Sequence, residues 1–93
     1  MALIKYLELS LDQGKSVVMM RDATKAFSVS LGVPEDEEND LKNYGTLEAP
    51  MVEEILELTR PGVNRITVGD QTYRFFRSFT HIAEVGAVVF APA

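Results

Sequence analysis

The spacing of apolar residues changes near Asn64, and this change limits the possible folds more than any other feature of the chain. Before Asn64 the apolar residues recur mostly at helical intervals, whereas after it apolar and polar residues alternate as in strands. Three segments are predicted strands, with a turn at Gly69–Gln71: Ile66–Val68, Thr72–Phe79 and Val85–Phe90. We therefore predict an α+β fold in which N-terminal helices pack on a C-terminal three-stranded antiparallel sheet.

The first segment, residues 2–13, fits two structures. Leucines recur at helical spacing from Leu3 to Leu11, but part of the same stretch also alternates as a half-buried strand would. The segment is either a helix that ends at Gly14 or the first arm of a hairpin whose return strand is Ser16–Met20. The helix is the preferred prediction.

Two helices are predicted in the region that follows. Asp22 is suited to cap a helix that ends at Gly32, because its carboxylate can accept hydrogen bonds from the first free N–H groups. The second helix begins at Pro34, where proline and several carboxylates suit the first turn, and it ends before Gly45.

Another helix is predicted from Pro50 to Thr59. Met51, Ile55 and Leu58 share one of its faces, and the proline and glycine that follow it end the helix. Its other face is acidic.

The chain has 93 residues, so we expect one domain, residues 1–93, with room for a single hydrophobic core. It has no cysteine, which excludes disulfides and thiolate chemistry together. A small domain without cross-links relies on packing or on a partner, so self-association is an expectation. No apolar run is long enough to span a bilayer and no export signal is present, so we expect a soluble cytoplasmic protein.

Acidic residues are concentrated in the middle of the chain. Nine of the 14 acids lie between Pro34 and Leu58, where Lys42 is the only basic residue, and the net charge of the whole chain is −5. Such a segment can steer a cationic partner or keep the protein soluble. As a partner-binding surface it would use eight carboxylates: Glu35, Asp36, Glu37, Glu38, Asp40, Glu53, Glu54 and Glu57.

No residue pattern predicts catalysis. The acidic cluster after Pro34 lacks the alternating ligands and the bend glycine of a calcium loop. His81 is the only histidine and has no carboxylate or ligand at a useful spacing. The serines lack the glycines of a nucleophile elbow, and the glycines form no phosphate cradle. We therefore expect no catalytic residues, no metal and no cofactor, and we do not expect an enzyme.

Two alternative functions follow from the C-terminal third. Aromatic and arginine side chains interleave in residues 73–79, and single-strand nucleic-acid binders stack bases on strands of this kind; the candidates are Tyr73, Arg74, Phe75 and Arg77. The acidic net charge disfavours nucleic acid as a partner. The apolar C-terminal strand could instead join copies of the chain into a homo-oligomer, with an interface at Val85, Val88, Val89 and Phe90.

The function favoured by the sequence is that of a non-catalytic protein-binding module. The acidic surface within residues 35–57 would dock a basic partner surface, as an inhibitor or adaptor does, and apolar residues beside it would prolong the complex. A nucleic-acid-handling complex fits as the partner, because proteins that grip nucleic acid are built to accept rows of negative charge.

Overall fold

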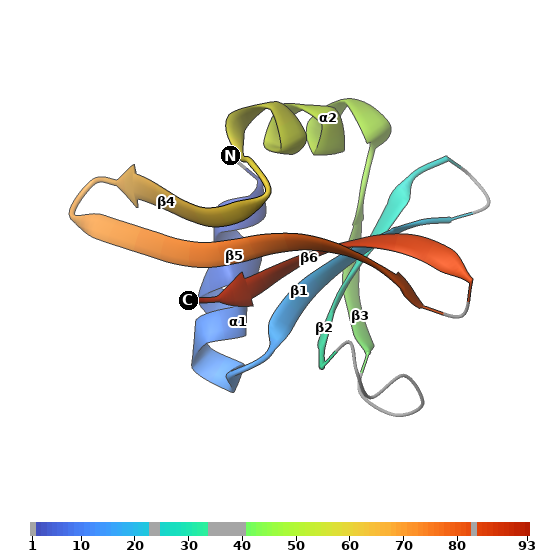
Figure 1. Ribbon diagram of the computed structural model, residues 1–93, viewed down its shortest axis with the longest axis horizontal. Coiled ribbons are helices and arrows are strands. Elements are labelled where there is room, and N and C mark those ends of the chain that lie inside the picture. The colour runs from blue at the N-terminus through green and yellow to red at the C-terminus, as the bar shows by residue number, and fades with distance from the viewer. Residues whose placement is uncertain (1, 23–24, 34–40, 83) are drawn as a thin grey trace.

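The six strands assigned in the described residues form one antiparallel sheet, and both helices pack on the same hydrophobic core (Figure 1). This structure is a computed structural model and describes residues 2–22, 25–33, 41–82 and 84–93. Its elements are α1 (Leu3–Gln13), β1 (Ser16–Arg21), β2 (Phe27–Gly32), β3 (Lys42–Leu47), α2 (Ala49–Leu58), β4 (Gly62–Val68), β5 (Gln71–Ile82) and β6 (Val85–Pro92). The strand order is β3-β2-β1-β6-β5-β4, so β3 and β4 are the edges of the sheet.

The predicted first helix is confirmed as α1. Gly14 ends it with a left-handed backbone conformation (φ 65°), which glycine adopts without steric cost, and the Gly14 N–H donates to the carbonyl oxygen of Ser10. Leu3 and Leu7 are buried, whereas Leu11 is exposed. The hairpin alternative is wrong, because β1 pairs with β2 and β6 rather than with the preceding segment.

The helix predicted from Asp22 to Gly32 is wrong. The Asp22 N–H donates to the carbonyl oxygen of Ala26 at 2.9 Å, within the turn that joins β1 to β2. In β2, Val29 and Leu31 are buried beneath the helices and alternate with serines on the other face. As a strand, β2 buries every second side chain and also pairs with a neighbouring strand on each side. A helix could not pair in this way.

The helix predicted to begin at Pro34 and to end before Gly45 is also wrong where the structure describes it. Residues 42–47 form the edge strand β3, which pairs with β2 through an irregular register near Val29. The earlier part of the predicted helix, residues 34–40, lies outside the described residues.

The prediction of a three-stranded sheet in an α+β fold is therefore wrong, because the sheet has six strands. Three of them, β1 to β3, come from the region expected to be mainly helical. The helix predicted at Pro50–Thr59 is confirmed as α2, and the predicted C-terminal meander is confirmed as β4, β5 and β6 with a turn at Gly69–Asp70.

The main core lies between the sheet and the two helices. The rings of Phe75 and Phe90 meet edge to face at its centre, with centroids 5.6 Å apart. Side chains from both helices and from every strand but β4 are buried there: Leu3, Tyr6, Leu7, Val17, Met19, Val29, Leu31, Leu47, Val52, Ile55, Tyr73, Phe75, Val88 and Phe90. A smaller cluster on the opposite face of the sheet contains Val18, Ile82, Ala87 and Val89.

Gly45 in β3 is required by the close approach of α1. A Cβ atom at this position would lie 2.7 Å from the Tyr6 hydroxyl oxygen but 3.8 Å from the ring carbon that carries it.

We therefore expect Gly45→Ala to destabilise the chain by about 1–2 kcal/mol, because Tyr6 is buried and its ring is confined. The same change in a Tyr6→Phe background should cost nothing, because the obstructing oxygen is absent. Urea denaturation of the four chains measures this coupling, and equal costs in both backgrounds would contradict the contact.

Among the described residues, neither helix has the length and apolar character needed to cross a membrane.

Candidate functional site

The helix α2 carries three exposed glutamates, Glu53, Glu54 and Glu57. It begins after an extended residue, Glu48, and has Pro50 in its first turn. Proline is tolerated there because the N–H that it lacks would have no partner within the helix. Val52 and Ile55 are buried against the core and fix the side of α2 that faces the sheet.

The C-terminal end of α2 is held by Arg77 of β5. Its Nη1 atom donates to the Leu56 carbonyl oxygen at 3.1 Å and to the Thr59 hydroxyl oxygen at 2.8 Å. The Thr59 hydroxyl in turn donates to the Ile55 carbonyl oxygen at 2.8 Å. A cation at this end satisfies free carbonyl groups and suits the negative end of the helix dipole. Arg77 therefore positions α2.

The turn after α2 is fixed by the side chain of Asn64, which is nearly buried. Its amide nitrogen donates to the carbonyl oxygens of Arg60, at 2.7 Å, and Gly62, at 3.1 Å. Its amide oxygen accepts the Arg60 N–H at 2.9 Å. Both ends of the connection between α2 and β4 are thus anchored, so the orientation of α2 is set by specific contacts.

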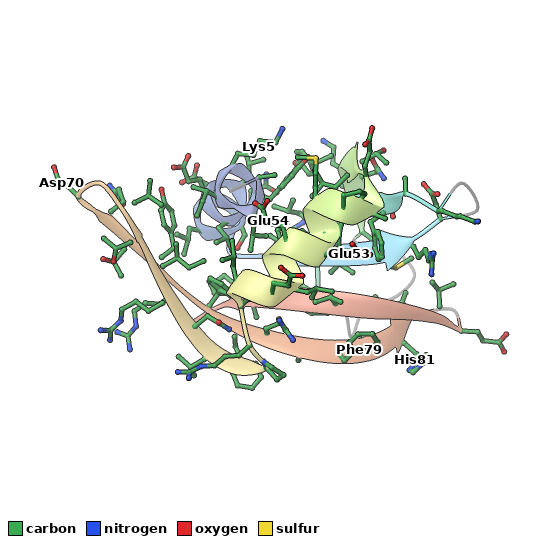
Figure 2. The ribbon with its side chains drawn as sticks, turned by 90° about the horizontal axis from the view of Figure 1, so that it is seen from above. Lys5, Glu53, Glu54, Asp70, Phe79 and His81 are labelled. Atoms are coloured by element: carbon green, nitrogen blue, oxygen red, sulfur yellow. The ribbon has the colours of Figure 1, made fainter. Side chains whose placement is uncertain are left out.

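The outer surface of α2, defined here as Met51, Glu53, Glu54, Glu57 and Leu58, faces solvent (Figure 2). Met51 and Leu58 are 44% and 60% exposed, and they flank Glu54 at intervals of one helical turn. Within the described residues none of the three glutamate carboxylates takes part in an ion pair or hydrogen bond. Carboxylates and exposed apolar side chains therefore share one surface.

The other predicted partner-binding carboxylates, Glu35, Asp36, Glu37, Glu38 and Asp40, lie outside the described residues. The described part of the predicted acidic surface is therefore the three glutamates of α2 alone.

Acidic and basic residues lie in different kinds of secondary structure. No acidic residue occurs in any of the six strands, which carry five basic residues: Arg21, Lys42, Arg65, Arg74 and Arg77. The helices carry Glu8, Asp12, Glu53, Glu54 and Glu57 against Lys5 alone. The described chain is therefore polarised, with an acidic helical layer and basic strands.

The face of β4 and β5 turned away from the helices forms a second exposed surface. Its residues stand in directly opposed cross-strand pairs: Val63 with Phe76, Arg65 with Arg74, and Thr67 with Thr72. The threonine hydroxyl oxygens are 3.1 Å apart. Val63 and Phe76 are 54% and 46% exposed, although both are large apolar side chains. We call Val63, Arg65, Arg74 and Phe76 the β4–β5 outer surface.

Most residues of the predicted nucleic-acid-binding strand have other contacts. Tyr73 and Phe75 are buried in the core, and Arg77 holds α2. The Tyr73 hydroxyl donates to a Glu8 carboxylate oxygen at 2.5 Å, and this hydrogen bond, together with burial, raises the pKa of Tyr73. Of the four residues predicted to contact bases, only Arg74 is exposed. Phe76 lies on the same face as Arg74 and is an exposed aromatic residue that the predicted set of four did not include.

The predicted oligomer interface in the C-terminal strand is internal. β6 lies between β1 and β5, and both of its edges are hydrogen-bonded within the chain. Val88, Val89 and Phe90 are buried, whereas Val85 is 37% exposed. Pairing of β6 with another chain would require the sheet to open.

Phe76, Phe79 and His81 are among the residues that line an open groove of ≈ 660 Å³. Figure 2 shows Phe79 and His81 on the part of β5 farthest from the turn that contains Asp70. Phe79 is highly exposed, and its ring lies over Gly86, where a Cβ atom would be 3.4 Å from it. Covering an otherwise bare glycine of the neighbouring strand is a structural role for this ring.

No three acidic or histidine side chains within the described residues are grouped closely enough to hold a metal ion. Comparisons of the chain with protein-family models, with curated proteins and with solved structures found no match.

Proposed function

We propose that the chain is a non-catalytic protein-binding module, of the inhibitor or adaptor type, that docks a basic partner surface through the outer surface of α2. The observation that supports this proposal is the placement of Glu53, Glu54 and Glu57 on one exposed helix, beside exposed Met51 and Leu58. Exposed carboxylates alone often serve solubility, but carboxylates that border exposed apolar side chains form a surface suited to protein docking.

The carboxylates and the apolar residues would have different effects on binding. Glu53 and Glu57 lie one helical turn apart and repel each other by a few tenths of a kcal/mol (about 0.2–0.5), and a partner's lysine or arginine side chains would remove this cost. The negative field speeds the encounter with a basic surface, whereas burial of Met51 and Leu58 slows dissociation. Proteins that handle nucleic acid carry such basic surfaces and are the partner class that we propose.

Replacement of Glu53, Glu54 and Glu57 by glutamine is expected to lower the association rate with the partner by about tenfold or more and to flatten its salt dependence. Glutamine preserves the length and the helix propensity of each side chain, so the fold should persist. The partner is obtained by capture from the native host and mass spectrometry, and the rates are then measured with the purified partner over a range of salt concentrations.

The matched control removes three acids elsewhere, by Asp12→Asn, Asp70→Asn and Glu84→Gln, and so changes the net charge equally. It should retain most of the association rate. If both variants slow association to the same extent, net charge rather than the α2 surface governs binding, and the proposal fails. A Met51→Ser and Leu58→Ser variant should mainly raise the dissociation rate.

A further inference from the structure

Arg65 and Arg74 form an unusual pair on the outer face of the sheet. They stand directly opposite each other on β4 and β5, where Cβ atoms are about 4.5–5.5 Å apart and like charges destabilise the sheet. Neither guanidinium group has a carboxylate or hydrogen-bonding partner among the described residues. A ligand that brings two negative charges at the same spacing would turn this repulsion into attraction.

The neighbouring pair on the same face indicates what else that ligand contains. Val63 and Phe76 follow the arginines directly in the register and leave about half of their side chains exposed. Together the two pairs form a surface with a cationic half and an apolar half. Its ligand should therefore carry paired anions beside apolar side chains.

The chain itself presents such a structure on α2. Glu53 and Glu57 are one turn apart, which places their Cβ atoms about 5–6 Å from each other, close to the spacing of the two arginines. Met51 and Leu58 supply exposed apolar groups on the same helix. Within each pair the two like charges repel each other. Contact between the acidic pair and the basic pair would offset both repulsions.

We propose that the β4–β5 outer surface binds α2 of a second copy of the chain. This inference rests on the proposed role of α2 as a docking surface and names one partner for it. One copy cannot make the contact internally, because α2 packs on the core side of the sheet whereas Arg74 and Phe76 point from the other side. The contact therefore joins two copies. Made once per pair, it extends into chains or closes into rings, and made twice, reciprocally, it gives a two-fold dimer.

Arg74 is the better probe of the two arginines. Arg65 also borders a small depression with Glu57 at the end of α2 in its own copy, although the two side chains form no ion pair. Exposed ion pairs are individually weak and are screened by salt, so the association should be seen at high protein concentration and low ionic strength.

The test is sedimentation velocity of the purified chain over a range of concentrations up to about 1 mM, at about 30 mM and about 500 mM salt. At low salt the average sedimentation coefficient should rise with concentration, and at high salt the rise should disappear. One variant removes the sheet surface, by Arg74→Ala with Phe76→Ser. The other removes the acidic pair, by Glu53→Gln with Glu57→Gln. Each variant alone should remain monomeric.

Mixing the two variants provides the decisive measurement. Each retains one intact surface, and the replacements are uncharged, so the mixture should form a discrete 1:1 dimer that cannot grow further. Monomer under every condition for the parent chain would overturn the inference, and the proposed function would stand because it is measured with a separate partner. Self-association that survives Glu53→Gln with Glu57→Gln would exclude α2 as the occupant. Binding of a single-stranded oligothymidine, lost on Arg74→Ala without any self-association, would identify nucleic acid as the occupant instead and equally overturn it.

Discussion

Phe75→Ala is expected to destabilise the chain by about 3–5 kcal/mol, whereas Phe76→Ala should change its stability by less than about 1 kcal/mol. The two residues are neighbours in β5, but the Phe75 side chain is fully buried against Phe90 and Phe76 is 46% exposed on the opposite face. A domain of this size has a total stability of about 5–14 kcal/mol, so Phe75→Ala would remove a large share of it. Urea denaturation followed by circular dichroism measures both variants.

A conservative control separates packing from other effects of the Phe75 substitution. Phe75→Leu keeps most of the buried volume and should cost clearly less than Phe75→Ala, because the cavity that remains is smaller. Equal losses for Phe75→Ala and Phe76→Ala would contradict the assignment of the two faces of β5. That result would also remove Phe76 from the β4–β5 outer surface.

The C-terminal hairpin was predictable because the residues that determine it are close together in the sequence. The Gly69–Asp70 turn joins two segments whose residues alternate, and the register follows from a turn this short. The same holds for α2, whose buried residues Val52 and Ile55 and whose acidic side are set by helical spacing within ten residues.

The N-terminal strands were not predictable in this way, because their local pattern fits two periods. Phe27 and Leu31 are four residues apart and suit a helix, yet with Val29 between them they also alternate as a strand. The choice is made by β1 and β3, whose backbones pair with both edges of β2. Such pairing depends on residues distant in the sequence, which a reading of one segment does not include.

The candidate surfaces, too, were predictable only where nearby residues determine them. The carboxylates of α2 were predicted because a helix fixes which residues share a side. On β5, alternation separates Tyr73, Phe75 and Arg77 from Arg74 and Phe76, but both sets contain aromatic residues and arginine. Only the position of the helices determines which set is buried.

The central position of β6 leads to the second large effect. Val88→Pro is expected to prevent folding, with a loss of more than about 3 kcal/mol, because proline removes a backbone donor and strains a strand that has neighbours on both sides. Val88 lies opposite Met19 of β1 and Phe79 of β5, so no edge of this strand faces solvent. Circular dichroism and the dispersion of amide signals in a nitrogen–proton correlation spectrum report the outcome.

Proline in the edge strand β4 provides the matched control. Thr67 and Val68 are adjacent, and alternate residues of an edge strand direct their N–H groups away from the sheet, so at least one of Thr67→Pro and Val68→Pro should leave the fold intact. If Val88→Pro instead folds normally and only dissolves an oligomer, β6 lies at an edge and joins copies of the chain. The assembly would then run through the C-terminal strand rather than through α2 and the β4–β5 outer surface.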